Sequence, residues 1–238
     1  MLDVPTAGDR IAALDWSGIA DALDGHGYAT TPPLLTGAEC RALIEGYDDA
    51  DRFRSRVVMA RHGYGRGEYQ YYAYPLPTLI GELRAALYPA LAGIANRWSA
   101  ALGMAGFPAD HAGFLARCHA AGQWRPTPLL LRYGPGDYNC LHQDLYGDLH
   151  FPLQAAILLS RPGEDFTGGE FVLTEQRPRM QSRAEVVTLH QGEAVVFATN
   201  QRPVAGTRRT YRVAMRHGVS RLHAGHRHTL GIIFHDAR

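Results

Sequence analysis

A histidine and an aspartate stand two positions apart in the segment Leu141-His142-Gln143-Asp144. On a β-strand successive side chains point to opposite faces, so His142 and Asp144 would lie on one face and Gln143 on the other. An imidazole and a carboxylate placed in this way can occupy two adjacent positions around one metal ion. Because so short a pattern also arises by chance, further ligands are needed before it indicates a metal site.

A second candidate ligand, His217, closes a segment that begins at Tyr211. Its period-two alternation places positions 211, 213, 215 and 217 on a mostly apolar face and two arginines on the other. The apolar face is expected to point inward, which would deliver His217 to the interior. A buried histidine needs a hydrogen-bonding partner or a metal, and taken alone His217 fits either.

Arg227 and Thr229 share the inward face of a third predicted strand, which begins ten residues after His217. A buried arginine is costly unless an anion neutralises it. The planar guanidinium matches a carboxylate through two parallel hydrogen bonds, and the threonine hydroxyl can donate another. These two residues are therefore candidates for binding a carboxylate group of a ligand.

The three patterns together indicate an oxygenase. Two histidines and one carboxylate leave three positions open on an octahedral metal, which is typical of non-haem Fe(II) oxygenases. A keto-acid with a second carboxylate can fill two of these positions while its far carboxylate meets Arg227. His223 is a rival for the distal ligand, but it falls in a predicted turn, and His235 and Asp236 are expected to be structural.

The elements that must position these groups differ between the two halves of the chain. Helices are predicted from a capping box at 36–39 to about 47, over the apolar repeat 79–94, which Pro89 should break or kink, and over 109–120. Short strands are predicted at 128–133, 140–145, 153–159, 169–174, 186–189, 193–198, 210–217 and 227–234. The expected fold class is α+β: a double-stranded β-helix (jelly roll) at 126–238, with a mainly helical layer (1–125) packed against it as one unit.

The segment 52–74 differs from the predicted helices around it, because it has two candidate strands joined by a glycine-rich loop. Arg54 and Arg56 could bind phosphate or an acidic substrate, and Tyr69 and Tyr71 could stack on a base. A solvated strand edge and packing against the barrel are the plainer interpretations. We interpret the segment as a candidate substrate lid, because its glycines would allow it to move.

Composition narrows the class of protein. The formal net charge of +1 argues against binding of polyanions through bulk charge. All 24 cationic side chains are arginine. The three scattered cysteines form neither a disulfide framework nor a zinc site. There is no signal-peptide pattern and no apolar run of membrane-spanning length, so a cytoplasmic protein without a membrane partner is expected. Oligomeric state is not indicated.

The stretch from Tyr133 to Phe234 resembles the 2-oxoglutarate/Fe(II) oxygenase superfamily, especially its prolyl-hydroxylase-like branch. The resemblance rests on Y-G-P-G before H-Q-D, GGEF at 168–171, GEAVVF at 192–197, HGV at 217–219 and R-H-T at 227–229. It implies that His142, Asp144 and His217 bind Fe(II), and that Arg227 and Thr229 bind the far carboxylate of 2-oxoglutarate, in a pocket lined by Tyr133. It also implies O2 as cosubstrate and hydroxylation of a C–H bond with release of succinate and CO2. Many members of that branch have lysine where this chain has Arg227.

The full chain also resembles an uncharacterised bacterial family for which oxidative repair of alkylated nucleic acids has been proposed, in phrases such as FPLQ at 151–154 and GIIFHD at 231–236. A small-molecule or peptidyl substrate is the first expectation, and dealkylation of damaged nucleic acid is the alternative. The near-neutral charge and the lack of an evident basic stripe argue against nucleic acid. A non-oxygenase, cupin-like metal-binding jelly roll is the remaining alternative.

Overall fold

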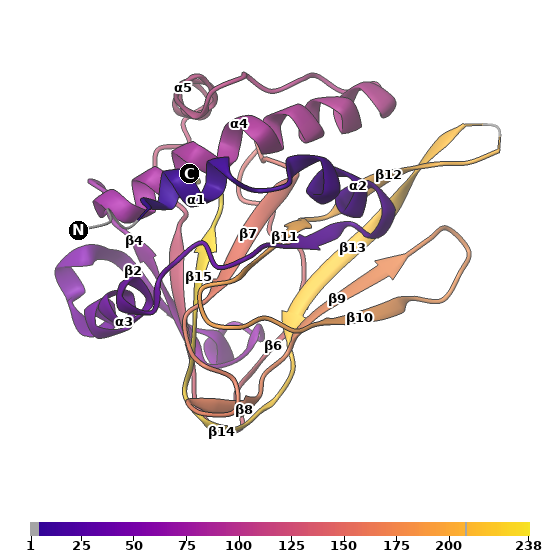
Figure 1. The fold of residues 1–238 in the computed structure, drawn as a ribbon. Helices are drawn as coiled ribbons and strands as arrows, with labels where there is room; N and C mark the ends of the chain where they lie inside the picture. Colours follow the sequence, from indigo (N-terminus) through magenta and orange to yellow (C-terminus); the bar gives the residue numbers. More distant parts are fainter. Residues whose placement is uncertain (1–4, 208) are drawn as a thin grey trace.

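The computed structural model describes residues 5–207 and 209–238 and consists of two facing β-sheets with helices on one outer side (Figure 1). The larger sheet has the strand order β1 (Tyr28–Thr30), β11 (Ala194–Ala198), β7 (Leu153–Leu158), β15 (Arg227–Ile232), β5 (Leu129–Tyr133), β4 (Glu68–Tyr72) and β2 (Phe53–Val58). The smaller sheet has the order β10 (Arg183–Val187), β9 (Phe171–Gln176), β13 (Thr210–Val219), β6 (Tyr138–His142) and β3 (Gly65–Arg66), and β12 (Gln201–Ala205) also pairs with β13. A short ladder joins β8 (Phe166–Gly168) to β14 (Leu222–Gly225).

The helices are α1 (Ala7–Ala12), α2 (Trp16–His26), α3 (Gly37–Glu45), α4 (Thr78–Ala101) and α5 (His111–Ala120). Figure 1 shows α4 lying across the larger sheet, with α1, α2 and α5 close to it. Alternation on β15 separates two environments: Leu230 and Ile232 belong to the core beneath the helices, whereas Arg227 and Thr229 line a cavity between the sheets. The expected jelly roll with a helical layer is confirmed.

Pro89 was expected to break or kink its helix, and a break is not observed, because α4 runs through it. Proline removes the hydrogen bond to the carbonyl four residues earlier, that of Ala85. Pro89 and Ala85 are both exposed, so water can satisfy that carbonyl while the opposite face of α4 stays packed.

The first half of the chain contributes strands as well as helices. β1 pairs with β11, and β2 and β4 extend the larger sheet, so strands from both sides of residue 125 share one sheet. Most of the predicted lid, 52–74, is built into the sheets as β2, β3 and β4, and its turn at 59–64 lies between them. None of the helices in the described part of the chain has the length and apolar character needed to cross a membrane.

Candidate active site

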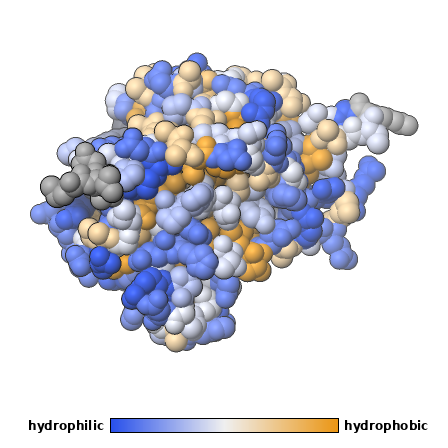
Figure 2. Space-filling view, viewed as in Figure 1, coloured by the Kyte–Doolittle hydropathy of each residue, from blue (hydrophilic) through white to orange (hydrophobic). Residues whose placement is uncertain are grey.

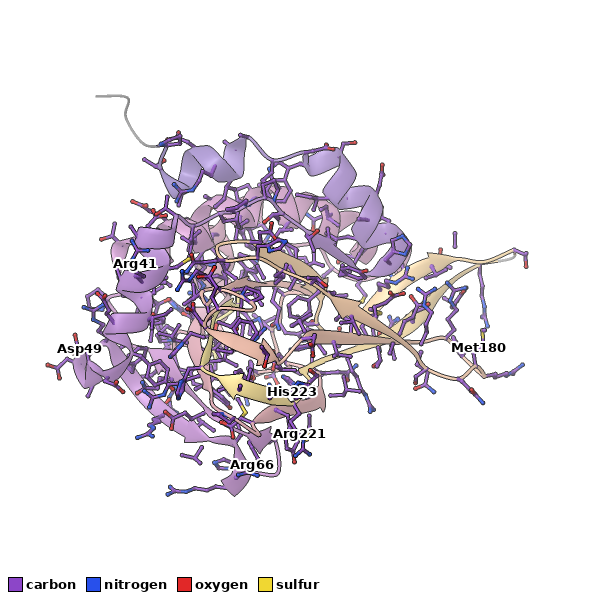
Figure 3. All side chains as sticks on the ribbon, turned by 60° about the horizontal axis from the view of Figure 1, so that its bottom comes forward. Arg41, Asp49, Arg66, Met180, Arg221 and His223 are labelled. Carbon is purple, nitrogen blue, oxygen red and sulfur yellow. The ribbon has the colours of Figure 1, made fainter. Side chains whose placement is uncertain are left out.

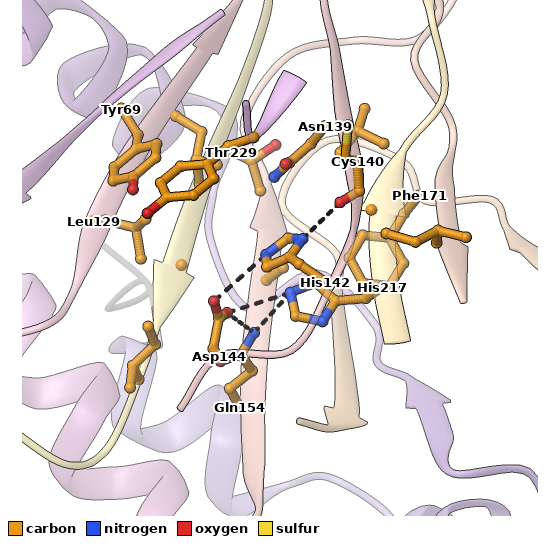
Figure 4. A pocket seen from close by; sticks show the side chains of 18 of the residues that line it. Tyr69, Leu129, Asn139, Cys140, His142, Asp144, Gln154, Phe171, His217 and Thr229 are labelled. Atoms are coloured by element: carbon orange, nitrogen blue, oxygen red, sulfur yellow. Dashed lines mark hydrogen bonds and ion pairs between the residues drawn. The ribbon is translucent and has the colours of Figure 1, made fainter. Parts of the chain in front are cut away.

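The three predicted metal ligands meet at one point between the sheets (Figure 4). The register of β6 and β13 pairs His142 directly with His217, and Asp144 follows two residues after the end of β6. The Asp144 carboxylate lies 3.4 Å from His142 Nε2 and 3.3 Å from His217 Nε2. One ligand atom from each residue lies within 4.8 Å of the others, which is a spacing that could hold a metal ion.

Neighbouring groups orient both imidazoles. His142 Nδ1 lies 2.8 Å from the Cys140 carbonyl oxygen, so Nδ1 carries the proton and the Nε2 lone pair is free for a metal. The His217 ring packs against Phe171 and Phe197, and its Nδ1 atom is buried without a hydrogen-bonding partner among the described residues. Both Nε2 atoms therefore face Asp144.

Two residues that the sequence had not singled out hold the carboxylate. The Tyr146 hydroxyl donates to Asp144 Oδ1 at 2.7 Å, and Gln154 Nε2 donates to Oδ2 at 2.8 Å. Gln154 comes from β7, where it is a polar side chain among buried apolar ones, and Tyr146 has the same two-residue spacing from Asp144 as His142. The polar position in an apolar strand and the two-residue spacing are both visible in the sequence, but neither indicates which residue the side chain contacts.

The electrostatics of the cluster keep Asp144 ionised. Burial raises the pKa of Asp144, but hydrogen bonds from both histidines outweigh it, and the pKa lies well below its ordinary value. Burial lowers the pKa of His142, yet Asp144 outweighs that effect and the net shift is upward. For His217 burial prevails over Asp144, and its pKa is lowered. An ionised carboxylate beside a neutral His217 suits a divalent cation.

The cluster opens into a cavity of about 350 Å³ between the two sheets. Arg227, Thr229 and Tyr133 line this cavity together with the three candidate ligands. The register of β15 and β5 pairs Arg227 with Tyr133, which places the two side by side. The Tyr133 hydroxyl is buried and has no hydrogen-bonding partner among the described residues.

Arg227 is buried, with 3% of its surface exposed, and its guanidinium donates to the Thr229 hydroxyl at 2.6 Å. No carboxylate of the described residues forms an ion pair with it, and its Nε atom has no partner there. Gly169 adopts φ +67°, and a Cβ at this position would lie 3.1 Å from Arg227 Cδ. Gly169, the second glycine of GGEF, thus leaves room for the arginine.

The four predicted substrate residues separate into two groups. Tyr69 lines the cavity, and Tyr71 packs behind it, with ring centroids 5.3 Å apart. Arg54 and Arg56 do not line the cavity: Arg54 stacks on the Tyr71 ring at 4.5 Å, and Arg56 pairs with Glu68. The structure therefore brings Tyr69 to the cavity, places Tyr71 behind it, and leaves the two arginines outside.

The competing histidines lie elsewhere. His223 is exposed on β14 and does not belong to the candidate ligand cluster, whose second histidine is His217. His235 and Asp236 are fully buried, as expected of structural residues. Asp236 forms an ion pair with Arg84 at 2.8 Å and accepts from Tyr74 at 3.0 Å.

Known proteins resemble this chain in sequence and in fold. Residues 67–237 match a family, Oxygenase-NA, described as an oxygenase catalysing oxidative methylation of damaged DNA. An uncharacterised protein of Mycobacterium tuberculosis is 52% identical over 164 residues, which cover 68% of this chain and 70% of that protein, and the sequence from a second strain matches equally well.

Among solved structures, a Pseudomonas putida prolyl-4-hydroxylase superposes with a TM-score of 0.54 and 17% identity, covering 94% of this chain and 99% of that one. A 2-oxoglutarate/Fe(II) oxygenase-family oxidoreductase from Burkholderia pseudomallei gives a TM-score of 0.55 and 16% identity, covering 93% and 92%. At these identities the likeness establishes the fold. The family match identifies the chain as a member of the Oxygenase-NA family, and its fold is the one shared by the prolyl-4-hydroxylase and the 2-oxoglutarate/Fe(II) oxygenase-family structure described above.

Proposed function

We propose that His142, Asp144 and His217 hold Fe(II), and that Arg227 and Thr229, beside Tyr133, hold the far carboxylate of 2-oxoglutarate. The observation that carries the proposal is the buried, unneutralised guanidinium of Arg227 in the same cavity as the ligand cluster. A buried cation needs an anion, and a dicarboxylate reaching from the metal would supply it. The unpartnered Tyr133 hydroxyl and His217 Nδ1 are further polar atoms in this cavity wall.

The bound iron and 2-oxoglutarate supply the oxidising power that converts a C–H bond to C–OH, while O2 is consumed and succinate and CO2 are released. The protein's own residues bind and orient these groups. Tyr146 and Gln154 fix the two oxygens of Asp144, so the carboxylate presents one geometry. Leu129, Leu131 and Ile233 give the cavity apolar walls that limit access of water.

We further propose that the oxidised group is an alkyl substituent on a nucleic-acid base, since the family described for this chain acts on damaged DNA. Two tyrosines of the cavity support an aromatic substrate. Tyr64 lines the cavity, is 50% exposed and stacks on His62 with ring centroids 5.3 Å apart, and Tyr69 lies on the wall. Enzymes that act on a base take it out of the stack and hold it against such rings.

The bond changes balance for an N-methyl group. Its C–H bond becomes C–OH with one oxygen atom from O2, and the other oxygen enters succinate as 2-oxoglutarate loses CO2. The N–CH2OH product then breaks its C–N bond, the hydroxyl proton passes to nitrogen, and formaldehyde leaves.

The test is incubation of the Fe(II)-loaded protein with 2-oxoglutarate and an oligonucleotide carrying N-methylated bases. Equal amounts of succinate and formaldehyde are expected, and an unmethylated oligonucleotide of the same sequence should release no formaldehyde. The His142→Ala protein should release neither product. Succinate formed at the same rate with and without the methyl group, or stimulated by a proline-containing peptide instead, would contradict the proposed substrate.

A further inference from the structure

Two two-stranded ribbons project from the body of the protein on the side away from α3. Figure 1 shows the β9–β10 and β12–β13 hairpins extending beyond the sheets, and Figure 3 shows Met180 at the tip of the first, far from Arg41. Figure 2 shows that their visible surface is mostly hydrophilic. Both ribbons include or pair with β13, the strand that carries His217.

The charge of the chain is concentrated in these ribbons. Residues 171–187 and 201–219 contain eight arginines and two glutamates, a net charge of +6. Because the whole chain carries +1, the remainder carries −5. The near-neutral total, which argued against a polyanion, therefore hides a strongly basic part.

Strand alternation sorts these charges onto two faces. On the inner face Glu175 pairs with Arg202 and Arg177, and next to it Glu185 pairs with Arg183. The glutamates are thus all engaged on that side. Each of the three arginines there forms an ion pair with one of the two glutamates.

The opposite face, which we name the arginine face, consists of Arg212 and Arg216 on β13 with the residues in register beside them. Those neighbours are uncharged: Val172, Thr174, Gln176, Ala184, Val186, Gln201, Pro203 and Ala214. Arg212 and Arg216 are exposed, and neither forms an ion pair with any described residue. Arg216 lies on a strand paired on both sides, so it does not serve to protect a sheet edge.

The turn of the β9–β10 ribbon adds a third uncompensated arginine. Arg179 is exposed and adopts φ +63°, and it is the one non-glycine residue with a positive φ in the described part of the chain. A left-handed backbone favours glycine or asparagine and disfavours arginine. An arginine kept there at a conformational cost indicates a use for its side chain.

From these observations we infer that the arginine face and the turn at Arg179 bind the phosphate backbone of a nucleic acid. The inference rests on the proposed function, which requires a polymer to be held while one nucleotide enters the cavity. Guanidinium groups match phosphates, and Thr174, Gln176 and Gln201 add neutral hydrogen-bonding groups. Arg212 precedes His217 by five residues, about 17 Å along a strand, which corresponds to about five nucleotides.

The test is fluorescence anisotropy with a labelled duplex two helical turns long, titrated between about 50 and 200 mM salt. In the double variant Arg212→Gln, Arg216→Gln the slope of log affinity against log salt should fall by about 1.8. The matched control is Arg41→Gln, Arg117→Gln, which removes two exposed arginines from α3 and α5 and should leave the slope unchanged. Equal losses in both double variants would overturn the inference, as would competition by polyglutamate as effective as that by unlabelled duplex.

Arg179→Gly separates binding from stability. The substitution relieves the strained turn, so the melting temperature should stay the same or rise while duplex affinity falls several-fold and the salt slope falls by about 0.9. Unchanged affinity for the duplex would show that Arg179 is not part of the interface.

Binding of 2-oxoglutarate to the Fe(II)-loaded ribbon variants should equal that of wild type. If wild type binds 2-oxoglutarate but no duplex, this inference fails and the proposed iron site stands. If wild type binds duplex but no 2-oxoglutarate, the proposed iron site fails and this inference stands.

Discussion

The guanidinium of Arg227 donates to the hydroxyl of Thr229 at 2.6 Å, and no carboxylate of the described residues neutralises it. Both side chains come from β15 and face the cavity that contains the candidate metal ligands. Burial lowers the pKa of Arg227, which shows that its surroundings disfavour the charge. The protein thus keeps a cation where it destabilises the ligand-free fold, and a bound dicarboxylate would relieve this.

Replacement of Arg227 by methionine should therefore affect stability and binding in opposite directions. Without 2-oxoglutarate, Arg227→Met should raise the free energy of unfolding by about 1 kcal/mol, because an unpaired buried charge is removed. With Mn(II) in place of iron and 2-oxoglutarate at about 100 times its Kd, wild type should gain about 2.7 kcal/mol and the variant almost nothing. Urea unfolding measures both, with the exposed Arg221→Met as control. A ligand-free variant that is markedly less stable than wild type would contradict the role given to Arg227.

Tyr146 should tune the metal site through Asp144. Tyr146→Phe removes the hydroxyl that donates to Asp144 Oδ1 and leaves the ring in place. Loss of such a supporting hydrogen bond is expected to weaken Fe(II) binding about 10- to 100-fold. Anaerobic metal titration measures the change. Tyr88→Phe, whose hydroxyl donates to the Pro108 carbonyl oxygen instead, is the matched control and should bind iron as wild type does; equal affinities in all three proteins would rule out this role.

The buried ion pair between Arg84 and Asp236 should be important for stability. Asp236→Asn leaves the 1%-exposed guanidinium of Arg84 without its counter-charge, and a loss of about 3 kcal/mol in the free energy of unfolding is expected. The corresponding change in an exposed pair, Asp49→Asn beside Arg52, should cost much less, because water screens an exposed ion pair. Denaturant unfolding of both variants tests the contrast, and similar losses would show that burial of the pair is not decisive.

Stability should also fall in mild acid. Burial lowers the pKa of His228 from 6.5 to about 4. As the pH falls below about 6.5 the unfolded chain takes up this proton before the folded one does, so the folded state loses stability down to about pH 4. Between about pH 7.5 and 5 the loss from this residue is about 2 kcal/mol. His228→Phe should abolish that share of the pH dependence; an unfolding free energy that falls as steeply in the variant would assign the effect to other groups.

Much of the fold and the ligand cluster could be predicted because both depend on period-two alternation. The strands that carry His142, His217 and Arg227 lie within a few residues of their predicted ranges, and their alternation directs these side chains inward. The pairing of His142 with His217 depends on which strands become neighbours, which alternation along one strand does not specify. Tyr146 and Gln154 could not be assigned to Asp144 for the same reason.

Local irregularities account for the residues that were misplaced. Arg54 and Arg56 would share one face of a regular strand, but a bulge between Phe53 and Ser55 interrupts the alternation of β2. Arg54 consequently turns toward Tyr71, while Arg56 meets Glu68. The basic ribbons were missed because a net charge averages over faces that the folded sheets keep separate.

Anaerobic addition of 2-oxoglutarate to the Fe(II)-loaded protein tests the iron site and the cosubstrate site in one measurement. Wild type should develop the weak visible metal-to-ligand charge-transfer band of a chelated keto-acid. Arg227→Ala should require far more 2-oxoglutarate to reach the same absorbance, and His142→Ala should show no band because it does not retain iron. A flat spectrum from wild type with iron demonstrably bound, or stoichiometric iron in His142→Ala, would contradict the assignment of this site.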